Sequence, residues 1–485
     1  MDDRFDPFNL FERTVANSPE RIALSIGTSQ WTYRELHKLA LAYSAWCANN
    51  SPEKGRVAVF ARRTVEAYAA ILGILHSGRS YVPIHPDHPP ERWRRMIDAA
   101  SVSEGSVAPA DIALATGITG VQWCSDPPEV PVPELRSDRS AEAYVMFTSG
   151  STGGPKGVPV GRAQVAEYLR HQLSTYEFHG EDRFSQFFAL TFDLSVHDLF
   201  ICWAVGGRLC VPSEDQPLRS AAFAREERIT VWFSVPSQVD LLRRVRALPP
   251  DSLPDLRLAF FCGEVLSAEV VSAFQLAAPD CRVINLYGPT ETTIAITAHT
   301  IDRQVLERSG TIAIGRPFPG HLIRLEDRLE DGKGELLIAG PQVNAGYLND
   351  PAATGKAFVE MDGCTWYRTG DLVRIDAEGI IHFICRTDDQ VKIMGHRVEP
   401  AEVDQILAPA IAPAISITLP VQVNGTFRLV TFIDAEVESA PLFLLLRRDL
   451  PLHMIPDRIV KVDRFPYSVH GKVDRRALLD RLTDQ

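Results

Sequence analysis

Residues 144–160, YVMFTSGSTGGPKGVPV, join a short apolar run to a loop of hydroxyls and glycines that is closed by one lysine. The apolar run predicts a buried strand. Glycines let backbone N–H groups approach an anion, hydroxyls donate further hydrogen bonds, and Lys156 adds a positive charge. The Walker motif is absent, because the serines and threonines precede the lysine. The stretch therefore predicts a strand that ends in a polyphosphate-binding loop, with a flexible connection as the alternative.

Helix-like and strand-like patterns alternate on both sides of this loop. Residues 31–50 carry apolar positions at helical spacing, with Thr32 and Glu35 placed as a capping box, and residues 56–61 form a short β-like run. Residues 229–236, 256–263 and 281–288 read as buried strands that each end at a loop. This rhythm predicts an α/β fold with largely parallel sheets, in which ligand sites gather at the carboxyl ends of strands.

The pattern of apolar and polar residues changes from about residue 322. Shorter alternating segments there predict an antiparallel β subdomain, and the residues after Arg386 predict a small α+β domain. A chain of 485 residues is also too long for one hydrophobic core. We expect a large N-terminal domain over residues 1–386, made of two α/β sheet subdomains plus a β subdomain, and a small mobile α+β C-terminal domain over residues 387–485.

Composition excludes several classes of protein. The apolar content of 45% and the charged content of 23% are typical of soluble globular proteins, and no run of 18 apolar residues predicts a membrane span. The net charge of −12 disfavours nucleic acid and anionic membranes as partners. The eight cysteines lack C-x-x-C spacing, so neither a zinc site nor a disulfide framework is indicated. We expect a cytoplasmic monomer.

Four further motifs accompany the loop. They are NLYGPTETT (residues 285–293), YRTGD (367–371), CRTDDQVKIMGHRVEPAEVD (385–404) and PYSVHGKVDRRAL (466–478). In this order and spacing they resemble the motifs of the adenylate-forming (ANL) superfamily, which includes acyl-CoA synthetases, luciferases and peptide-synthetase adenylation domains. The resemblance covers the chain from about residue 10 to residue 480, so coincidence is not a serious alternative.

The resemblance implies ATP and Mg²⁺ as cofactors. Tyr287 would pack against adenine, Asn285 would lie near its amino edge, and Asp371 would accept both ribose hydroxyls. Glu291, with Thr152, would hold Mg²⁺, since a hard cation between phosphates needs oxygen ligands. The full set of residues assigned to the nucleotide is Thr148, Ser149, Gly150, Ser151, Thr152, Lys156, Asn285, Tyr287, Gly288, Thr290, Asp371, Phe383 and Arg386.

The same resemblance assigns the catalytic and hinge residues. Lys472 would bridge the α-phosphate and the attacking carboxylate, as a flexible ammonium can. Asp388 would be the hinge about which the small domain rotates, bringing the face of Lys392 to the site for the second half-reaction. The chain departs from the family pattern at two positions, with Cys385 in place of glycine and His470 in place of asparagine.

Residues 190–200, LTFDLSVHDLF, point to an amino acid as the acid that is activated. In amino-acid-activating relatives the aspartate of this motif pairs with the substrate ammonium, and here it is Asp193. The alternative is that Asp193 only caps a helix. The residues carried over as the walls of the acid pocket are Leu194, His197, Phe233, Phe260, Cys262, Gly263, Leu286, Ile294 and Ala295. They leave little room and offer no charge, so a small amino acid is expected, alanine first, then glycine or serine.

The implied reaction ends on a thiol that this sequence does not supply. We expect a separate acyl or peptidyl carrier protein with a phosphopantetheine arm, in natural-product biosynthesis. FCGEVL (residues 261–266) also resembles D-alanine–carrier-protein ligases of cell-envelope metabolism, although Leu286 departs from that subfamily. Proline or a small β-amino acid as substrate, an acyl-CoA synthetase, an amide ligase and a non-catalytic nucleotide-binding relative remain as alternatives.

Overall fold

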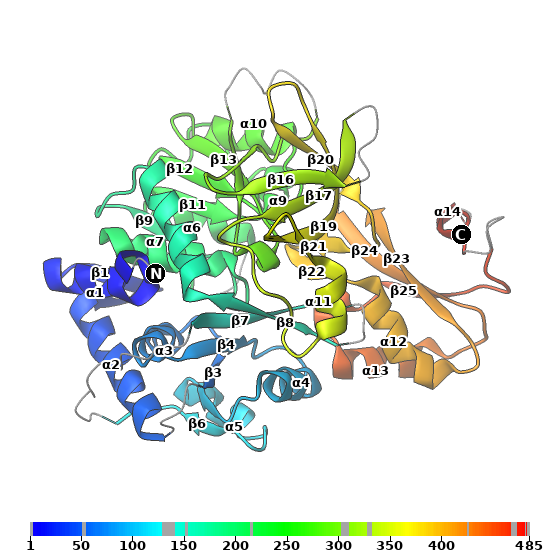
Figure 1. The fold of residues 1–485 in the computed structure, drawn as a ribbon, viewed down its shortest axis with the longest axis horizontal. Coiled ribbons are helices and arrows are strands. Elements are labelled where there is room, and N and C mark those ends of the chain that lie inside the picture. The colour runs from blue at the N-terminus through cyan, green and yellow to red at the C-terminus, as the bar shows by residue number, and fades with distance from the viewer. Residues whose placement is uncertain are drawn as a thin grey trace. The chain divides into compact units, whose positions relative to one another are not determined.

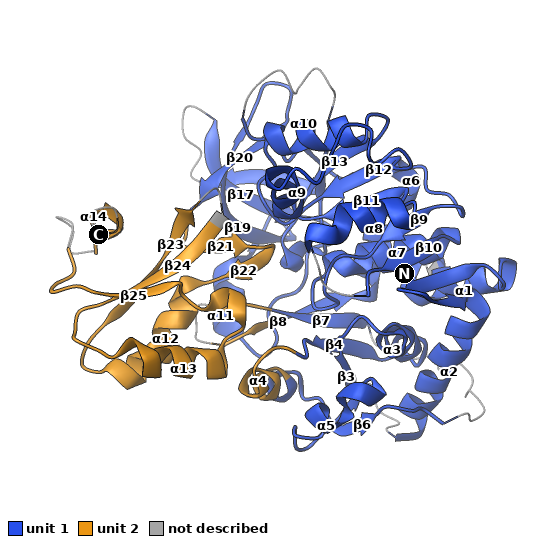
Figure 2. Ribbon diagram, turned by 180° about the vertical axis from the view of Figure 1, so that it is seen from behind, with its two compact units in different colours: residues 1–86, 97–147, 157–387 blue, residues 87–96, 148–156, 388–485 orange. Residues whose placement is uncertain are grey.

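The computed structural model describes residues 3–50, 55–128, 141–150, 154–213, 217–301, 310–326, 332–423, 426–466, 473–480 and 482. Figure 1 shows the fold, and Figure 2 shows its two compact units. The first unit comprises residues 1–86, 97–147 and 157–387, and the second comprises residues 87–96, 148–156 and 388–485. Within the described ranges, every helix is too short or too polar to cross a membrane.

The phosphate-loop candidate follows β7 (Glu142–Thr148), a strand of a six-stranded sheet. The order of strands is β6, β5, β3, β4, β7, β8, and β3 pairs in parallel with both β4 and β5. The other strands are β3 (Arg56–Phe60), β4 (Ser80–Ile84), β5 (Glu104–Ser106), β6 (Gln122–Cys124) and β8 (Lys156–Gly161). The helices of this stretch of chain are α3 (Val65–His76), α4 (Pro90–Ala100) and α5 (Ile112–Ala115). The strand predicted at residues 144–147 is confirmed.

A nine-stranded sheet carries the predicted strands at residues 229–236, 256–263 and 281–288. Its order is β15, β14, β13, β12, β11, β9, β10, β1, β2, and the run from β13 to β1 is parallel. The strands are β1 (Ile22–Ile26), β2 (Ser29–Thr32), β9 (Arg183–Ser185), β10 (Arg208–Val211), β11 (Val231–Ser234), β12 (Leu258–Phe261), β13 (Arg282–Tyr287), β14 (Thr297–Thr300) and β15 (Arg316–Pro317). The helices are α1 (Pro7–Asn17), α2 (Tyr33–Asn50), α6 (Arg162–Thr175), α7 (Leu194–Val205), α8 (Ser220–Glu226), α9 (Pro236–Arg244) and α10 (Ala268–Ala277).

The capping box predicted before α2 is present. The Thr32 backbone N–H donates to the Glu35 carboxylate at 2.8 Å, and the Glu35 N–H donates to the Thr32 hydroxyl at 3.2 Å. These reciprocal bonds satisfy donors that the first turn of a helix leaves unpaired.

Side chains alternate across β11 and β12, and this alternation separates two hydrophobic cores. Phe233 and Phe260 are register partners and lie in the core that includes α7, whereas Trp232 and Ala259 lie in the core that includes α10. Successive side chains of a strand point to opposite faces of the sheet. The two phenylalanines therefore face the helix that begins after Asp193.

The antiparallel β subdomain is also observed. It is a five-stranded sheet of β16 (Leu322–Glu326), β17 (Lys333–Ala339), β18 (Phe358–Met361), β19 (Cys364–Ile375) and β20 (Ile381–Arg386), with α11 (Pro351–Ala357) before β18. In the pairing of β19 with β20, Asp371 stands opposite Arg386. This register brings two predicted nucleotide residues together.

The C-terminal part of the second unit is an α+β structure, as predicted. A hairpin of β21 (Val391–Ile393) and β22 (His396–Val398) turns at Gly395, which has a φ of +81°. A three-stranded sheet follows, made of β23 (Ser416–Val423), β24 (Thr426–Ile433) and β25 (Arg458–Lys461). The helices are α12 (Pro400–Ile411), α13 (Ser439–Asp449) and α14 (Arg475–Asp480). The predicted fold class, α/β with a β subdomain and a small α+β part, is confirmed.

Candidate active site

Asp371 is the centre of a preassembled polar cluster in the first unit. One carboxylate oxygen accepts a hydrogen bond from the Arg386 guanidinium at 2.8 Å, and the other accepts one from the Tyr287 hydroxyl. Arg386 also donates to the Thr369 carbonyl at 2.7 Å. Burial and the neighbouring Asp371 carboxylate raise the pKa of Tyr287 well above its usual value. Because an ionised carboxylate has about four lone pairs, Asp371 can still accept hydrogen bonds from a diol such as ribose.

Asn285 and Phe383 lie near this cluster in chemically suitable surroundings for a purine. The Asn285 amide N–H donates to the Ala313 carbonyl at 2.9 Å, and its Oδ1 is buried without a hydrogen-bond partner among the described residues. An exocyclic amino group such as that of adenine would satisfy this oxygen. Phe383 and Tyr287 both pack against one small apolar cluster.

The loop after β13 has a strained backbone. Thr293 and Ile294 have φ values of +60° and +70°, which are unfavourable for β-branched residues. Gly288 is required here, because a Cβ atom would lie 2.5 Å from the Cα of Ala295. Strain of this kind persists only when neighbouring groups hold it, and it concentrates at functional sites.

Two buried polar residues that the sequence analysis missed hold this loop. The Gln342 side-chain amide donates to the carbonyls of Thr293 and Ala295 at 3.0 and 2.9 Å, and the Asn344 amide donates to the Thr290 carbonyl at 3.1 Å. The signal that could have found them is a polar pair at residues 342 and 344 directly after an apolar strand.

Glu291 is fully buried within the same loop, and its carboxylate accepts a hydrogen bond from the Tyr347 hydroxyl at 2.7 Å. Tyr347 is a third residue that the sequence analysis missed. A single fixed carboxylate suits Mg²⁺, which usually takes one or two protein carboxylates and completes its ligand set with phosphate oxygens and water. Glu291 therefore fits the predicted cation, whereas Thr152, the other predicted ligand, lies outside the described residues.

Asp193 stands at the N-terminal boundary of α7, but its side chain makes no capping hydrogen bond to that helix. Its Oδ2 instead accepts a hydrogen bond from the backbone N–H of Ile294 at 3.3 Å. The side chain is 8% exposed. Asp193 is thus the N-cap residue of α7 by position, but its carboxylate is hydrogen-bonded to the strained loop rather than to the helix.

The predicted pocket walls lie in the same unit as Asp193. They belong to one apolar core and come from α7, from the ends of three parallel strands and from the strained loop: Leu194, His197, Phe233, Phe260, Cys262, Leu286, Ile294 and Ala295. Gly263 has a φ of +94°, and a Cβ atom there would lie 3.6 Å from Leu194 Cδ1. The structure thus brings these residues to one side of the nine-stranded sheet.

The phosphate-loop candidate lies in the second unit, where carboxylates occupy its donors. The Gly150 N–H donates to Glu402 at 3.3 Å, and Lys156 Nζ lies 3.9 Å from the Glu399 carboxylate. The Ser149 hydroxyl donates to the Arg397 carbonyl at 2.7 Å. Glu402 also forms a buried ion pair with an arginine of α4, Arg92, at 2.7 Å. Ser149, Gly150 and Lys156, three of the residues that were predicted to bind triphosphate, are therefore paired with the protein's own acceptors.

The remaining predicted residues fall into two groups. Lys392 is exposed on β21, and Asp388 is the first residue of the last segment of the second unit. Rotation about Asp388 stays a prediction, as do the domain boundaries and the catalytic roles of the lysines. Ser151, Thr152 and Lys472 lie outside the described residues.

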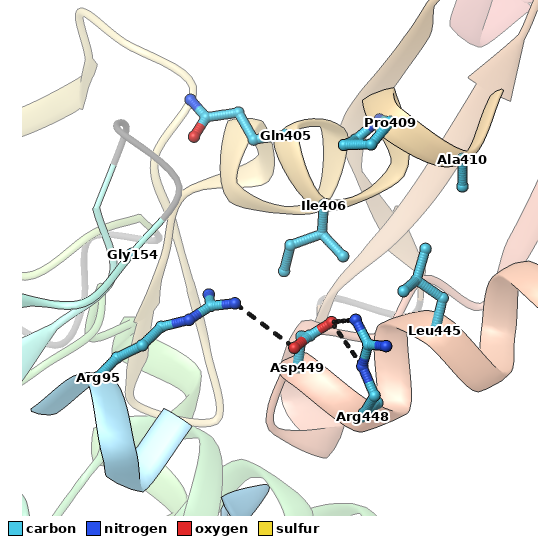
Figure 3. A pocket seen from close by; sticks show the side chains of 9 residues that line it. All are labelled: Arg95, Gly154, Gln405, Ile406, Pro409, Ala410, Leu445, Arg448 and Asp449. Carbon is cyan, nitrogen blue, oxygen red and sulfur yellow. Dashed lines mark hydrogen bonds and ion pairs between the residues drawn. The ribbon is translucent and has the colours of Figure 1, made fainter. Parts of the chain in front are cut away.

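A cavity of about 680 Å³ in the second unit is separate from the predicted acid pocket. It lies between α12 and α13, where Arg95 and Arg448 flank the Asp449 carboxylate (Figure 3). Of the described part of the phosphate-loop segment Gly154 lines it, and none of the predicted substrate residues that the structure describes does so.

Comparison with known proteins agrees with this geometry. Residues 11–348 match the family described as AMP-binding enzyme. The chain belongs to this family of adenylate-forming enzymes. It is 30% identical, over 96% of its length and 97% of the relative's, to the D-alanine--D-alanyl carrier protein ligase of Lacticaseibacillus casei. It is also 30% identical, over 98% of its length, to the delta-poly-L-ornithine synthetase of Acinetobacter baumannii, but spans only 36% of that protein.

A solved structure of an adenylation domain shares the fold of this chain. The structure of the Vibrio cholerae adenylation domain AlmE with glycyl-adenosine-5'-phosphate has a TM-score of 0.87 and 29% sequence identity, covering 99% of this chain and 98% of AlmE. The similarity over both full lengths agrees with the observed mix of α/β and β sheets.

Proposed function

We propose that this AMP-binding enzyme uses ATP to activate a small amino acid as an aminoacyl adenylate. It then transfers the aminoacyl group to the phosphopantetheine thiol of a separate carrier protein. In the first step the amino acid carboxylate attacks the α-phosphorus and pyrophosphate leaves. In the second, the thiol sulfur attacks the acyl carbon, a thioester forms and AMP leaves.

The observation that carries this proposal is the Asp193 carboxylate. It is buried, it makes no capping hydrogen bond to α7, and it accepts a hydrogen bond from the loop that also carries Tyr287 and Glu291. A buried carboxylate is stable only with compensating charge and hydrogen bonds, and a substrate ammonium would supply both. The amino acid would thus be held beside the nucleotide, where its carboxylate can reach the α-phosphate.

Catalysis would depend on positioning and charge rather than on acid–base chemistry. Asp371 and Arg386 would orient the ribose, and Asn285 the base. Lys472 would stabilise the charge that develops between the two reacting anions. Mg²⁺, when bound by Glu291 and the phosphates, would neutralise triphosphate charge.

Relatives support a small substrate. AlmE was solved with a glycyl adenylate, and the Lacticaseibacillus relative is a ligase for D-alanine. Phe233 and Phe260 are fully buried in the core that includes α7, and two large aromatic side chains among the walls favour a small substrate. We therefore propose alanine, glycine or serine as the substrate and a carrier protein as the acceptor.

ATP–pyrophosphate exchange across a panel of D- and L-amino acids tests this function, with fatty and aryl acids as controls. Asp193→Asn should lower exchange by about 10²- to 10³-fold with every amino acid, because the ammonium loses its buried counter-charge. Asp198→Asn is the matched control on the same helix. Burial raises the pKa of Asp198 well above its usual value, which favours the neutral carboxyl, so an isosteric amide should change exchange only a few-fold.

Two outcomes would contradict the proposal. Exchange that survives Asp193→Asn would remove the ammonium-pairing role. Exchange with fatty or aryl acids but with no amino acid would assign the protein to the acyl-activating branch instead.

A further inference from the structure

Two glutamates at the start of α12 face the phosphate-loop candidate. Glu399 is the N-cap residue of α12 by position, but its side chain makes no capping hydrogen bond, and its carboxylate lies 3.9 Å from Lys156 Nζ. Glu402 stands in the first turn, where a glutamate often bonds back to the N-cap backbone. Its carboxylate here accepts hydrogen bonds from two other segments of the second unit. Both acids therefore act away from the helix that carries them.

The Glu402 carboxylate joins three segments that are far apart in the sequence. Its Oε1 accepts a hydrogen bond from the Arg92 guanidinium of α4 at 2.7 Å, and its Oε2 accepts one from the Gly150 backbone N–H at 3.3 Å. The side chains of Arg92 and Glu402 are 7% and 1% exposed. Because Arg92 holds one oxygen of the carboxylate, it orients the other oxygen toward Gly150. Arg92 is thus a positioning residue for the contact between Glu402 and the loop.

The loop is closely packed around this contact. The Ser149 hydroxyl donates to the Arg397 carbonyl at 2.7 Å, and Ser149 is buried. A Cβ atom at Gly150 would clash with the Gly154 carbonyl oxygen, so glycine is required where Glu402 approaches. The Gly150 N–H has a single hydrogen, and two anions at one site repel each other. A phosphate oxygen can therefore bind this N–H only after the Glu402 carboxylate has left.

We infer that Glu402 is a latch that mimics phosphate: its carboxylate takes the place of a phosphate oxygen at Gly150 once pyrophosphate has left, and so protects the aminoacyl adenylate from reversal. Glu399 assists by pairing with Lys156. In the reversal a pyrophosphate oxygen attacks the α-phosphorus, the bond from phosphorus to the acyl oxygen breaks, and ATP and the free amino acid form. This inference rests on the proposed function, since it takes the loop as the pyrophosphate site. The competing explanation is an ion pair that only holds α12 to α4.

Such a latch lowers the apparent affinity for pyrophosphate, because only molecules with an open loop can bind it. In the experiment the enzyme forms its adenylate, gel filtration removes free ATP and pyrophosphate, and labelled pyrophosphate is added at graded concentrations. The ATP formed in a single turnover gives the pyrophosphate concentration at half-maximal rate. Glu402→Gln should lower this concentration by about three- to tenfold, since a neutral amide oxygen is a weaker acceptor than a carboxylate. Glu399→Gln should lower it by about twofold, because its ion pair is longer. Glu226→Gln, on an exposed side chain, should leave it unchanged.

The amount of adenylate recovered per protein reports that each variant has folded. An unchanged or higher half-maximal concentration in Glu402→Gln, with adenylate formed normally, would overturn the inference. If Glu402→Gln does not fold, an unchanged value in Glu399→Gln would overturn it. A wild type that forms no adenylate with any amino acid would instead contradict the proposed function. Titration calorimetry of pyrophosphate against the wild type and Glu402→Gln would then still test the latch, so the two failures are distinguishable.

Discussion

The polar cluster around Asp371 in the first unit and the phosphate-loop candidate of the second unit hold their polar groups in opposite ways. Asp371 is an acceptor that two protein donors orient, and its remaining lone pairs are available to a ligand. Gly150 N–H and Lys156 are donors that already face the carboxylates of Glu402 and Glu399. A backbone N–H has a single hydrogen, so it must exchange partners before it can bind phosphate. The Asp371 carboxylate thus keeps lone pairs that a ligand could use, whereas Gly150 N–H and Lys156 are already paired with carboxylates of the protein.

We expect the largest change in the KM for ATP from a substitution of Asp371, the acceptor in this comparison. Asp371→Asn would replace charged hydrogen bonds to both ribose hydroxyls by weaker ones and would turn an amide N–H₂ group toward Arg386 or Tyr287. We expect the KM for ATP in pyrophosphate exchange to rise by about 10²-fold, since each charge-assisted hydrogen bond contributes about 1.5–3 kcal/mol. Asp362→Asn is the control, because that side chain is 81% exposed and forms an ion pair with a half-exposed arginine, Arg324. An unchanged KM for ATP would show that Asp371 does not contact the nucleotide.

The sequence predicted the strands that carry the acceptor side, because these strands follow local patterns. Hydrophobic runs predicted β11, β12 and β13, and antiparallel pairing then places Asp371 opposite Arg386. Thr32 and Glu35 likewise predicted a capping box from a spacing of three residues. Local patterns of this kind are determined by side-chain period and by capping chemistry.

The sequence could not predict which groups occupy the donor side. Gly150 and Glu402 are 252 residues apart, and a contact over this separation depends on tertiary packing that no local pattern encodes. The strained loop at Thr293 and Ile294 was missed for the same reason, since Gln342 holds it from about fifty residues away. The sequence-based prediction therefore named the residues of the sites but not the distant residues that hold these loops or pair with their donors.

For the donor side we expect a smaller change in the KM for ATP, and in the opposite direction. Glu402→Gln would remove a charge that competes with phosphate for the Gly150 N–H, and we expect the KM for ATP to fall by about three- to tenfold, the difference between a charged and a neutral acceptor. The same change should lower the melting temperature, because Arg92 and Glu402 form a buried pair with 7% and 1% side-chain exposure.

Glu226→Gln, on a side chain that is 62% exposed, is the control for the loss of one carboxylate. A lower melting temperature with an unchanged KM for ATP would reduce Glu402 to a structural ion-pair partner. A higher KM would mean that Glu402 supports nucleotide binding, and it would remove the contrast between the two regions.

We expect the smallest effect from a substitution of Glu399, on the free energy of unfolding, and this effect depends on pH. Burial raises the pKa of this carboxyl, although the charges of Lys156 and Arg397 oppose the shift. Because the folded pKa lies above the unfolded value, the ionised carboxylate destabilises the folded state. This penalty is present above the folded pKa and is lost as the pH falls below the unfolded value. Glu399→Gln should therefore be more stable than wild type near about pH 7.5, and the difference should shrink toward about pH 4.5. Denaturant unfolding at the two pH values measures it, and a difference that grows on acidification would show that the carboxylate is stabilised by Lys156 rather than penalised by burial.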